Sequence, residues 1–254
     1  MMPSGRAARS SPAGSGKTSS GVDGVGNLLL ARLSPEDRAH LEPRLTPFEF
    51  RLGEVLQRPG EPVDSVYFVD RGLLSVVASD RNGETVETSM VGREGASGLV
   101  AACGVGVPYM THLVQIEGAG RRAPAALCRG LFQSSAAFRD IVTRHTQHVL
   151  AETRQSAVCQ AMHSAEGRCA RWLLESGDRA GCGDLVPLTQ EYLAAMLGVQ
   201  RTTVSAVAST LQRAGLIRYS RGRIRILDHP GLERASCDCR KAVKEFRETV
   251  LALT

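Results

Sequence analysis

Hydrophobic and polar positions follow a strand-like pattern in the first half of the chain. From Thr46 to about Arg129, short β-rich runs such as SVYFV, LLSVVAS, TVETSMV and THLVQIEG alternate with glycine-bearing turns. Those turns are expected at Gly53, Gly60, Gly72, Gly83, Gly92 and Gly118. The dipeptide Asn82-Gly83 is a strong hairpin signal. Many short strands separated by turns predict an antiparallel sandwich or barrel.

Helical spacing replaces this alternation after Ser134. No Pro or Gly occurs from Ser134 to His163, so the segment predicts one long helix. Its apolar positions are Phe138, Ile141, Val142, Val149 and Val158. Such a stripe either pairs with a second copy of the chain, which we favour, or packs back onto the β-domain. A further helix, AEGRCARWLLESGD, is expected to end near Gly177, and an earlier one to begin at the N-cap Ser34.

Two short helices joined by a tight turn are predicted between Leu188 and Gly215. Thr189 is a suitable N-cap for the first helix, and Gly198 ends it. The second helix begins at Arg201 and buries one face, formed by Val204, Val207 and Leu211. This pattern is typical of a helix-turn-helix, in which the second helix enters the major groove of DNA.

An arginine-rich hairpin, LIRYSRGRIRIL, follows these helices. Between Arg201 and Arg225 the chain has six arginines and no acidic residue. The alternation of the hairpin directs its arginines outward, where they suit phosphate contacts. The residues predicted to contact DNA are Thr189, Gln190, Arg201, Thr202, Thr203, Ser205, Ala206, Ser209, Arg218, Arg221, Arg223 and Arg225.

The distribution of charge supports a polyanionic partner. The 254 residues carry a net charge of +5 with 43% hydrophobic content, enough for two domains with substantial cores. From Val186 to Thr254 there are 11 Lys and Arg against 6 Asp and Glu, so the whole surplus lies in the C-terminal quarter. No apolar run has the length of a signal peptide or membrane span, and we therefore expect a cytoplasmic protein without membrane contact.

Catalytic chemistry is not indicated by any motif. AGSGKTSS resembles a phosphate-binding loop, but Ser11 stands where that loop needs glycine and no buried strand precedes it. No nucleophile–base pair or paired carboxylates are evident, so the chain is not expected to be an enzyme.

Cysteine usage fits a reducing compartment. The seven cysteines lack the spacing of a disulfide scaffold. Cys237 and Cys239 are too close together and too isolated to form a tetrahedral zinc set from one chain, and we expect no metal. A weaker alternative is a site on the face that His145 and His148 share with Cys159 and His163.

The chain resembles the Crp/Fnr superfamily of bacterial transcription regulators. The resemblance runs from Leu28 to about Cys239 and is carried by GEVLQRPGEPVDSVYFVDRGLLSV, the long helix and LTQEYLAAMLGVQRTTVSAVASTLQRAGLIRYSRGRI. It implies an α+β fold: an N-terminal antiparallel β-roll, like the cyclic-nucleotide-binding jelly roll, then a long dimerisation helix and a C-terminal winged helix-turn-helix. The expected parts are a tail that its Gly/Ser/Ala-rich composition predicts to be disordered (1–26), a sensory roll (27–133), a dimer helix (134–163), a DNA-binding domain (164–236) and a C-terminal helical extension (237–254).

The resemblance also implies a function. A homodimer would read a two-fold symmetric promoter site in double-stranded DNA, and RNA polymerase is a possible further partner. Arg201 matches the family's guanine-reading arginine, whereas Thr202 and Ala206 replace the Glu and Arg common at the next two specificity positions. The alternative is a signalling or protein-interaction module with the cyclic-nucleotide fold but no sequence-specific DNA binding.

The effector of the roll is left open. In the family's cyclic-nucleotide cassette, Gly92 and Glu94 would hold the ribose, and an Arg-Ser pair would hold the phosphate. Met110 and Thr111 stand at the Arg-Ser position, so we expect no bound cofactor, with cyclic nucleotide as the alternative. No cysteine precedes Cys103, so an iron–sulfur centre near the N-terminus is not expected.

Overall fold

The computed structural model describes residues 26–252. The tail expected at 1–26, with its AGSGKTSS segment, lies outside the described residues except for Gly26. The N-terminal elements are α1 (Leu28–Ala31), α2 (Pro35–Leu41), the 3₁₀ helix η1 (Glu42–Arg44), β1 (Thr46–Phe50), β2 (Val55–Gln57), β3 (Ser65–Ser79), β4 (Thr85–Val91), β5 (Ala96–Ser97), α3 (Leu99–Cys103) and β6 (Thr111–Pro124). The later elements are α4 (Ala125–Ser134), α5 (Ala136–Met162), α6 (Ala165–Ala180), β7 (Leu185–Pro187), α7 (Gln190–Leu197), α8 (Arg201–Arg213), β8 (Ile217–Ser220), β9 (Arg223–Ile226), α9 (His229–Ala235) and α10 (Cys239–Ala252).

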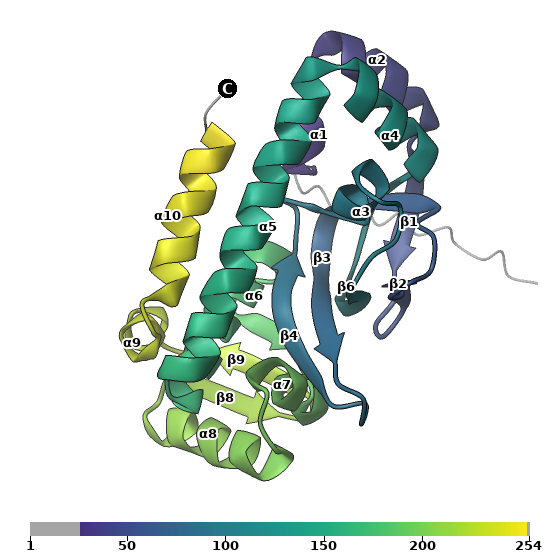
Figure 1. The fold of residues 1–254 in the computed structure, drawn as a ribbon. Coiled ribbons are helices and arrows are strands. Elements are labelled where there is room, and N and C mark those ends of the chain that lie inside the picture. The colour runs from purple at the N-terminus through teal and green to yellow at the C-terminus, as the bar shows by residue number, and fades with distance from the viewer. Residues whose placement is uncertain (1–25, 253–254) are drawn as a thin grey trace, which may run out of the picture.

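An antiparallel sheet forms the N-terminal half, as the strand pattern predicted. β3 pairs with β4, β5 and β6, and β6 also pairs with β1 and β2 (Figure 1). The β3–β4 hairpin turns at Asn82-Gly83, where Gly83 has a φ of 82° and the carboxylate of Asp80 accepts from the backbone N–H of Glu84. The expected hairpin is therefore confirmed.

Two of the expected turns are wrong. Gly72 lies within the long strand β3 and Gly118 lies within β6. A Cβ atom at Gly72 would lie 2.8 Å from the carbonyl oxygen of Ile116, and one at Gly118 would lie 2.0 Å from that of Arg71. The two glycines therefore allow β3 and β6, whose pairing is irregular here, to approach each other closely. They do not reverse the chain, as the sequence pattern had predicted.

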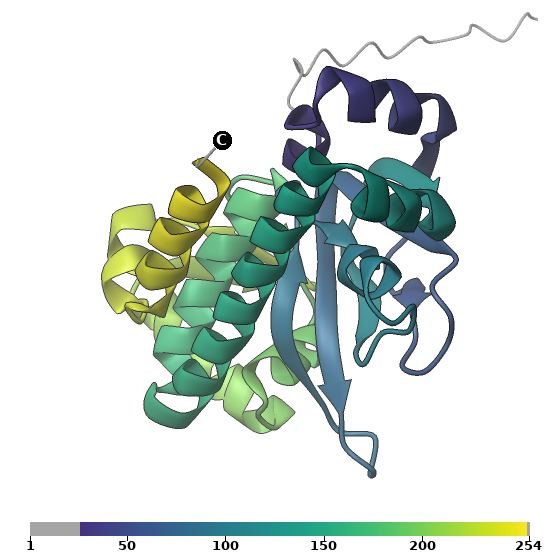
Figure 2. The ribbon, with the colours of Figure 1, turned by 45° about the horizontal axis from the view of Figure 1, so that its top comes forward.

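The long helix α5 packs within the chain along its first half. Phe138, Ile141 and Val142 are buried together with residues of the β-roll and α4, as the packing alternative expected. Farther along, Val158 is 43% exposed. The yellow helix α10 lies beside α5 in both ribbon views (Figures 1 and 2). The stripe is thus covered at one end and open at the other.

The helix-turn-helix region shares a core with the roll. Helix α6 was expected to end near Gly177; it continues three residues beyond it to Ala180, and Gly181, with a φ of 67°, is its C-cap residue. Buried residues of α6, α7 and α8 join Leu73, Met90 and Ile116 of the sheet in one hydrophobic cluster. The close passage of the chain favours glycine at position 177, because a Cβ atom there would lie 2.9 Å from the carbonyl oxygen of Gly183.

None of the helices between residues 26 and 252 combines the length and apolar character that a bilayer span requires.

Candidate nucleic-acid interface

Local capping forms the two short helices at the positions expected from the sequence. The Thr189 hydroxyl accepts from the backbone N–H of Tyr192 at 3.3 Å and caps α7. Gly198 ends α7 in the left-handed conformation, with a φ of 58°. Helix α8 then buries Val204, Val207 and Leu211, as predicted. These contacts fix which face of α8 turns to solvent.

The solvent face of α8 carries small and polar side chains over its first two turns. Arg201, Thr202, Thr203, Ser205 and Ala206 are exposed. Ser209, one turn farther along, is half-buried. Small side chains let a helix approach base edges closely, and hydroxyl groups can donate to or accept from them. The face is therefore compatible with insertion into a groove.

Strands β8 and β9 form the predicted hairpin with its arginines outward. Arg218 lies directly opposite Arg225, and Ser220 lies opposite Arg223. The turn residues Arg221 and Gly222 both have positive φ, 48° and 72°, which is the conformation of a two-residue hairpin turn. All four arginines are exposed, whereas Ile217, Ile224 and Ile226 on the other face are buried. The hairpin thus has one cationic face and one core face.

The start of α7 connects the hairpin to α8. The backbone N–H of Leu188 donates to the carbonyl oxygen of Gly222 at 2.8 Å, which holds the hairpin turn beside Thr189. Two residues on, the side-chain amide of Gln190 donates to the hydroxyl of Ser205 at 3.3 Å. The structure therefore brings together the predicted contact residues of α7, α8 and the hairpin turn on adjoining surface.

Arg201 has an acidic neighbour that could compete with a polyanion. Its guanidinium lies 3.0 Å from the carboxylate of Glu191, and both side chains are largely exposed. An exposed ion pair of this kind contributes about 0–1 kcal/mol. Arg201 can therefore exchange Glu191 for another acceptor at little cost.

The predicted effector residues lie in two different environments. The Glu94 carboxylate is buried, accepts from the backbone N–H of Gly92 at 3.0 Å and lies 3.6 Å from Arg179. Burial raises the pKa of Glu94, but the positive charges of Arg179 and Arg247 and the hydrogen bond from the backbone of Gly92 together outweigh this and bring the pKa below its ordinary value. Met110 instead packs against the apolar cluster around Phe50. The ligand role of these residues stays a prediction.

A cleft of about 400 Å³ beside Glu94 is bounded by α1, α6 and α10. Met110 and Thr111 do not line it; Thr111 instead pairs with Val77 at the start of β6. The cleft is lined by Leu28, Arg32, Arg93, Glu94, Asp178, Arg179, Arg247 and Glu248. Glu94 thus faces charged groups of the C-terminal half rather than the two residues with which the resemblance grouped it.

Sequence reasoning missed a buried ionic network between the roll, α5 and α6. Arg179 of α6 lies 2.8 Å from the carboxylate of Glu152 in α5 and donates to the carbonyl oxygen of Met90 in β4 at 3.0 Å. Trp172 of the same helix donates from its indole N–H to Glu87 of β4 at 2.8 Å. The one sequence signal for this network is the presence of charged residues among the apolar positions of α6.

The histidines expected on the face of α5 separate into two groups. His145 and His148 are buried, and burial lowers their pKa values to about 4 and about 3. His163 instead lies with Cys159, Cys237 and Cys239, and the potential ligand atoms of these four all lie within 4.8 Å of one another. The expectation that Cys237 and Cys239 are isolated is therefore wrong, because the α9–α10 link folds back onto the end of α5.

Comparison with known proteins finds likeness in both halves of the chain. Residues 167–235 match the Crp-like helix-turn-helix domain. Transcriptional regulator SdrP of Thermus thermophilus is 28% identical over 194 residues, which cover 72% of this chain and 91% of SdrP. The structure of TTHA1359, a CRP/FNR-family transcriptional regulator of the same organism, is similar with a TM-score of 0.62 and 25% identity, over 75% of this chain and 98% of that one.

A second solved structure extends the likeness of fold. It is a putative transcriptional regulator of the Crp/Fnr family from Eubacterium rectale, with a TM-score of 0.66, 20% identity, and coverage of 82% of this chain and 96% of that one. The shared architecture therefore includes the β-roll as well as the helix-turn-helix domain.

Proposed function

Because the chain belongs to the Crp/Fnr superfamily of transcription regulators, we propose that it binds double-stranded promoter DNA as a homodimer and reads a two-fold symmetric site. In this proposal α8 enters the major groove with Arg201, Thr202 and Ser205 toward base edges. The arginines of the β8–β9 hairpin contact phosphates beside the groove. The carrying observation is the exposed face of α8 beside the cationic face of the hairpin.

The different charges of α8 and the β8–β9 hairpin suit them to different contacts with DNA. The exposed side chains of the first two turns of α8 include one cation, Arg201, and several short polar groups, which suit contact with base edges. The hairpin presents Arg218, Arg221, Arg223 and Arg225, which suit contact with phosphates whatever the sequence. Affinity should therefore depend mainly on the hairpin, and base preference on α8.

An exposed stripe on the later part of α5 supports pairing with a second copy. Exposed positions are spaced alternately by four and three residues, the repeat by which two helices pair along a seam. They are Thr143, Gln147, Leu150, Arg154, Ala157 and Ala161. Leu150 is 46% exposed and Val158 beside the stripe is 43% exposed, so pairing would bury apolar surface that one chain leaves in water. A two-fold axis along α5 would place two α8 helices for half-sites about one turn of DNA apart.

The role of the roll follows from its contacts. Since α6 and α7 pack on β3, β4 and β6, the roll is proposed to hold the helix-turn-helix domain in position, and any effector would act by favouring one arrangement of the two. No bound cofactor is expected, and RNA polymerase is a further proposed partner. This proposal includes no catalytic step.

The test begins with selection of bound sequences from a random DNA pool, followed by fluorescence anisotropy with the selected duplex. We expect an enriched sequence with two-fold symmetry. Arg201→Ala should reduce the preference for the selected duplex over a scrambled one by about 5- to 150-fold, which corresponds to the loss of one bidentate base contact. Arg58→Ala, an exposed arginine of the roll, is the matched control and should leave the preference unchanged. Equal binding of all duplexes by a folded dimer would refute the proposal and favour the interaction module.

A further inference from the structure

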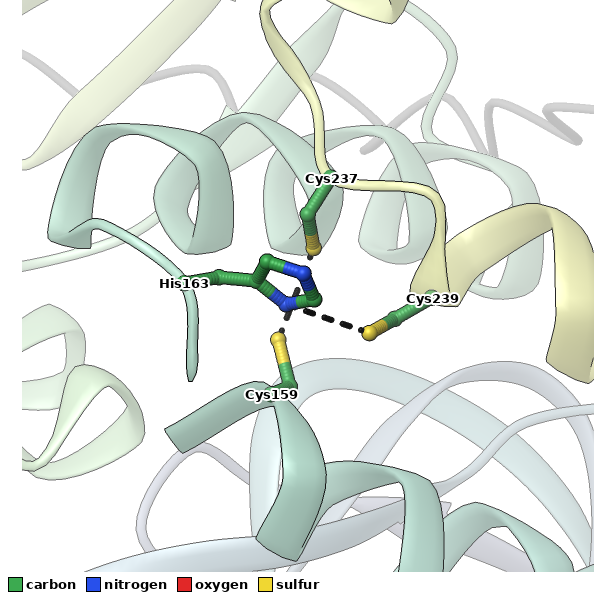
Figure 3. Close-up of side chains that lie close together, drawn as sticks. All are labelled: Cys159, His163, Cys237 and Cys239. Carbon is green, nitrogen blue, oxygen red and sulfur yellow. Dashed lines mark hydrogen bonds between the residues drawn. The ribbon is translucent and has the colours of Figure 1, made fainter. Parts of the chain in front are cut away.

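Four side chains with metal-binding atoms meet where α5 ends. Cys159 lies in the last turn of α5 and His163 is its C-cap residue, while Cys237 lies in the link between α9 and α10 and Cys239 is the first residue of α10 (Figure 3). Cys159 and Cys239 are only 1% and 2% exposed. The cluster thus joins two segments more than seventy residues apart in sequence.

The separations of these atoms fit tetrahedral coordination. Zinc lies about 2.3 Å from thiolate sulfur and about 2.0–2.1 Å from imidazole nitrogen. Ideal tetrahedral angles then place two sulfurs about 3.8 Å apart, and a sulfur about 3.6 Å from a nitrogen. The Sγ atoms of Cys159 and Cys237 are 3.5 Å apart, and Cys239 Sγ is 3.4 Å from His163 Nδ1. Shifts of a few tenths of an ångström bring these two pairs to the ideal separations.

Neighbouring groups suit a cluster of thiolates around a cation. Gln155 donates from its amide to Cys239 Sγ at 3.1 Å, and the backbone N–H of Cys237 donates to the carbonyl oxygen of Gly167 at 3.3 Å. The positive charge of Arg171 interacts with the sulfurs of Cys159 and Cys237. Three thiolates and one Zn²⁺ carry a net charge of −1, which a nearby arginine partly balances. Such surrounding groups orient ligands and stabilise the bound metal.

We propose that Cys159, His163, Cys237 and Cys239 bind one Zn²⁺ ion, which fixes the α9–α10 link to the end of α5. Three cysteines and one histidine are a ligand set of structural zinc sites. On binding, the thiols lose their protons to solvent as the Zn–S bonds form. All four positions are filled by the protein, so the ion has no open position for a substrate. The site is independent of whether the chain binds DNA.

Coordination to zinc would link α5 to the segment that joins α9 and α10. Helix α10 packs along α5, and α9 packs against α6. A four-ligand ion would hold these contacts together at the point where α5 passes into the Crp-like helix-turn-helix domain. Removing the ion should therefore loosen α10 and lower the thermal stability of the whole chain.

The first test measures metal in the full chain purified under reducing conditions without added chelator. Elemental analysis by mass spectrometry should find about one zinc per chain. After metal removal, Co²⁺ should give the visible ligand-field bands and the thiolate charge-transfer band of tetrahedral sulfur-rich coordination. A chain that contains no zinc and gives no such cobalt spectrum overturns the proposal. Iron with acid-labile sulfide, or a Cys159–Cys237 disulfide that persists under reducing conditions, overturns it as well.

Variants assign the ion to this cluster. Cys239→Ser and His163→Gln should each lose most of the zinc, and the Tm of the metal-loaded protein should fall by about 5 °C or more. Cys103→Ser, a half-buried cysteine in the roll, is the matched control and should retain both zinc and Tm. Full zinc content in folded Cys239→Ser and His163→Gln chains contradicts the assignment. If those variants do not fold, the cobalt spectrum of the unaltered chain still decides whether a thiolate site is present.

Discussion

Glu87 offers a test of the contact between the roll and α6. Its carboxylate is buried in β4, where the hydroxyl of Ser75 and the indole N–H of Trp172 donate to its two oxygens. Burial raises the pKa of Glu87 to about 7; the two hydrogen bonds oppose the rise, and the charge of Glu152 adds to it. Near neutral pH the folded protein therefore holds a carboxyl group that titrates well above its ordinary range.

The sign of the effect follows from the two protonation states. In the unfolded chain Glu87 titrates at its ordinary pKa of 4.5, so below that pH it is protonated in both states and burial has no electrostatic cost. Between pH 4.5 and about 7 the unfolded state ionises first and the folded state loses stability. Above pH 7 the loss is complete, and a difference of about 2.5 pKa units corresponds to about 3 kcal/mol.

Glu87→Gln removes the charge and keeps a side chain of the same shape. We expect the free energy of unfolding in urea of the variant, relative to the original chain, to be about 2.5 kcal/mol higher at pH 8 than at pH 5, since part of the loss is already present at pH 5. Comparing the two pH values cancels any hydrogen bond that the amide fails to reproduce, since that loss is present at both. Trp172 is the single tryptophan of the chain, and its fluorescence reports unfolding at the contact itself.

The native fluorescence of Trp172 should also titrate with a midpoint near pH 7 in the original chain and lose that transition in Glu87→Gln. Glu84→Gln, an exposed carboxylate of the same hairpin, is the control and should change neither measurement. If the stability difference between Glu87→Gln and the original chain is the same at pH 5 and pH 8, the reasoning from burial is wrong.

Three further outcomes test other parts of the structure. Arg223→Ala should weaken binding to selected and scrambled DNA alike and reduce the slope of log affinity against log salt by about 1, as measured by anisotropy, whereas Arg58→Ala should not. Leu150→Glu should weaken dimerisation at least about tenfold in sedimentation velocity, because it places like charges in the exposed seam of α5. Arg179→Met should lower the free energy of unfolding by about 3–5 kcal/mol near neutral pH, because it leaves two buried carboxylates without their cation; the exposed Arg93→Met should stay within about 0.5 kcal/mol.

The features that the sequence predicted correctly are those set by neighbouring residues. The capping hydroxyl of Thr189, the left-handed Gly198 and the alternation of the hairpin each act over only a few positions, so their spacing is visible in the sequence. Gly72 and Gly118 were misinterpreted because the same residue type serves a turn and a close strand approach. Only the pairing partner, more than forty residues away, distinguishes the two.

Clusters assembled from distant segments were the least visible. Nothing in the spacing of Cys237 and Cys239 indicates that Cys159 lies 3.5 Å from one of them, since the distance depends on how α10 returns along α5. The acidic partners of Arg179 likewise come from the turn between β4 and β5 and from α5, and no local pattern selects them among the other acidic residues. Both clusters can therefore be recognised only in the tertiary structure.

Helix α6 connects these two clusters, and this limits how a signal could reach the helix-turn-helix domain. Near its start, Gly167 accepts from Cys237; at its end, Arg179 contacts Glu94 and Glu152. A rotation of α6 that repositions α8 must therefore break buried ionic contacts with the roll or carry Glu94 along with it. Because a broken buried ion pair costs several kcal/mol, an effector of the roll would need contacts that replace the partner of Glu94 or Arg179. The charged cleft beside Glu94 is the place where such contacts are available.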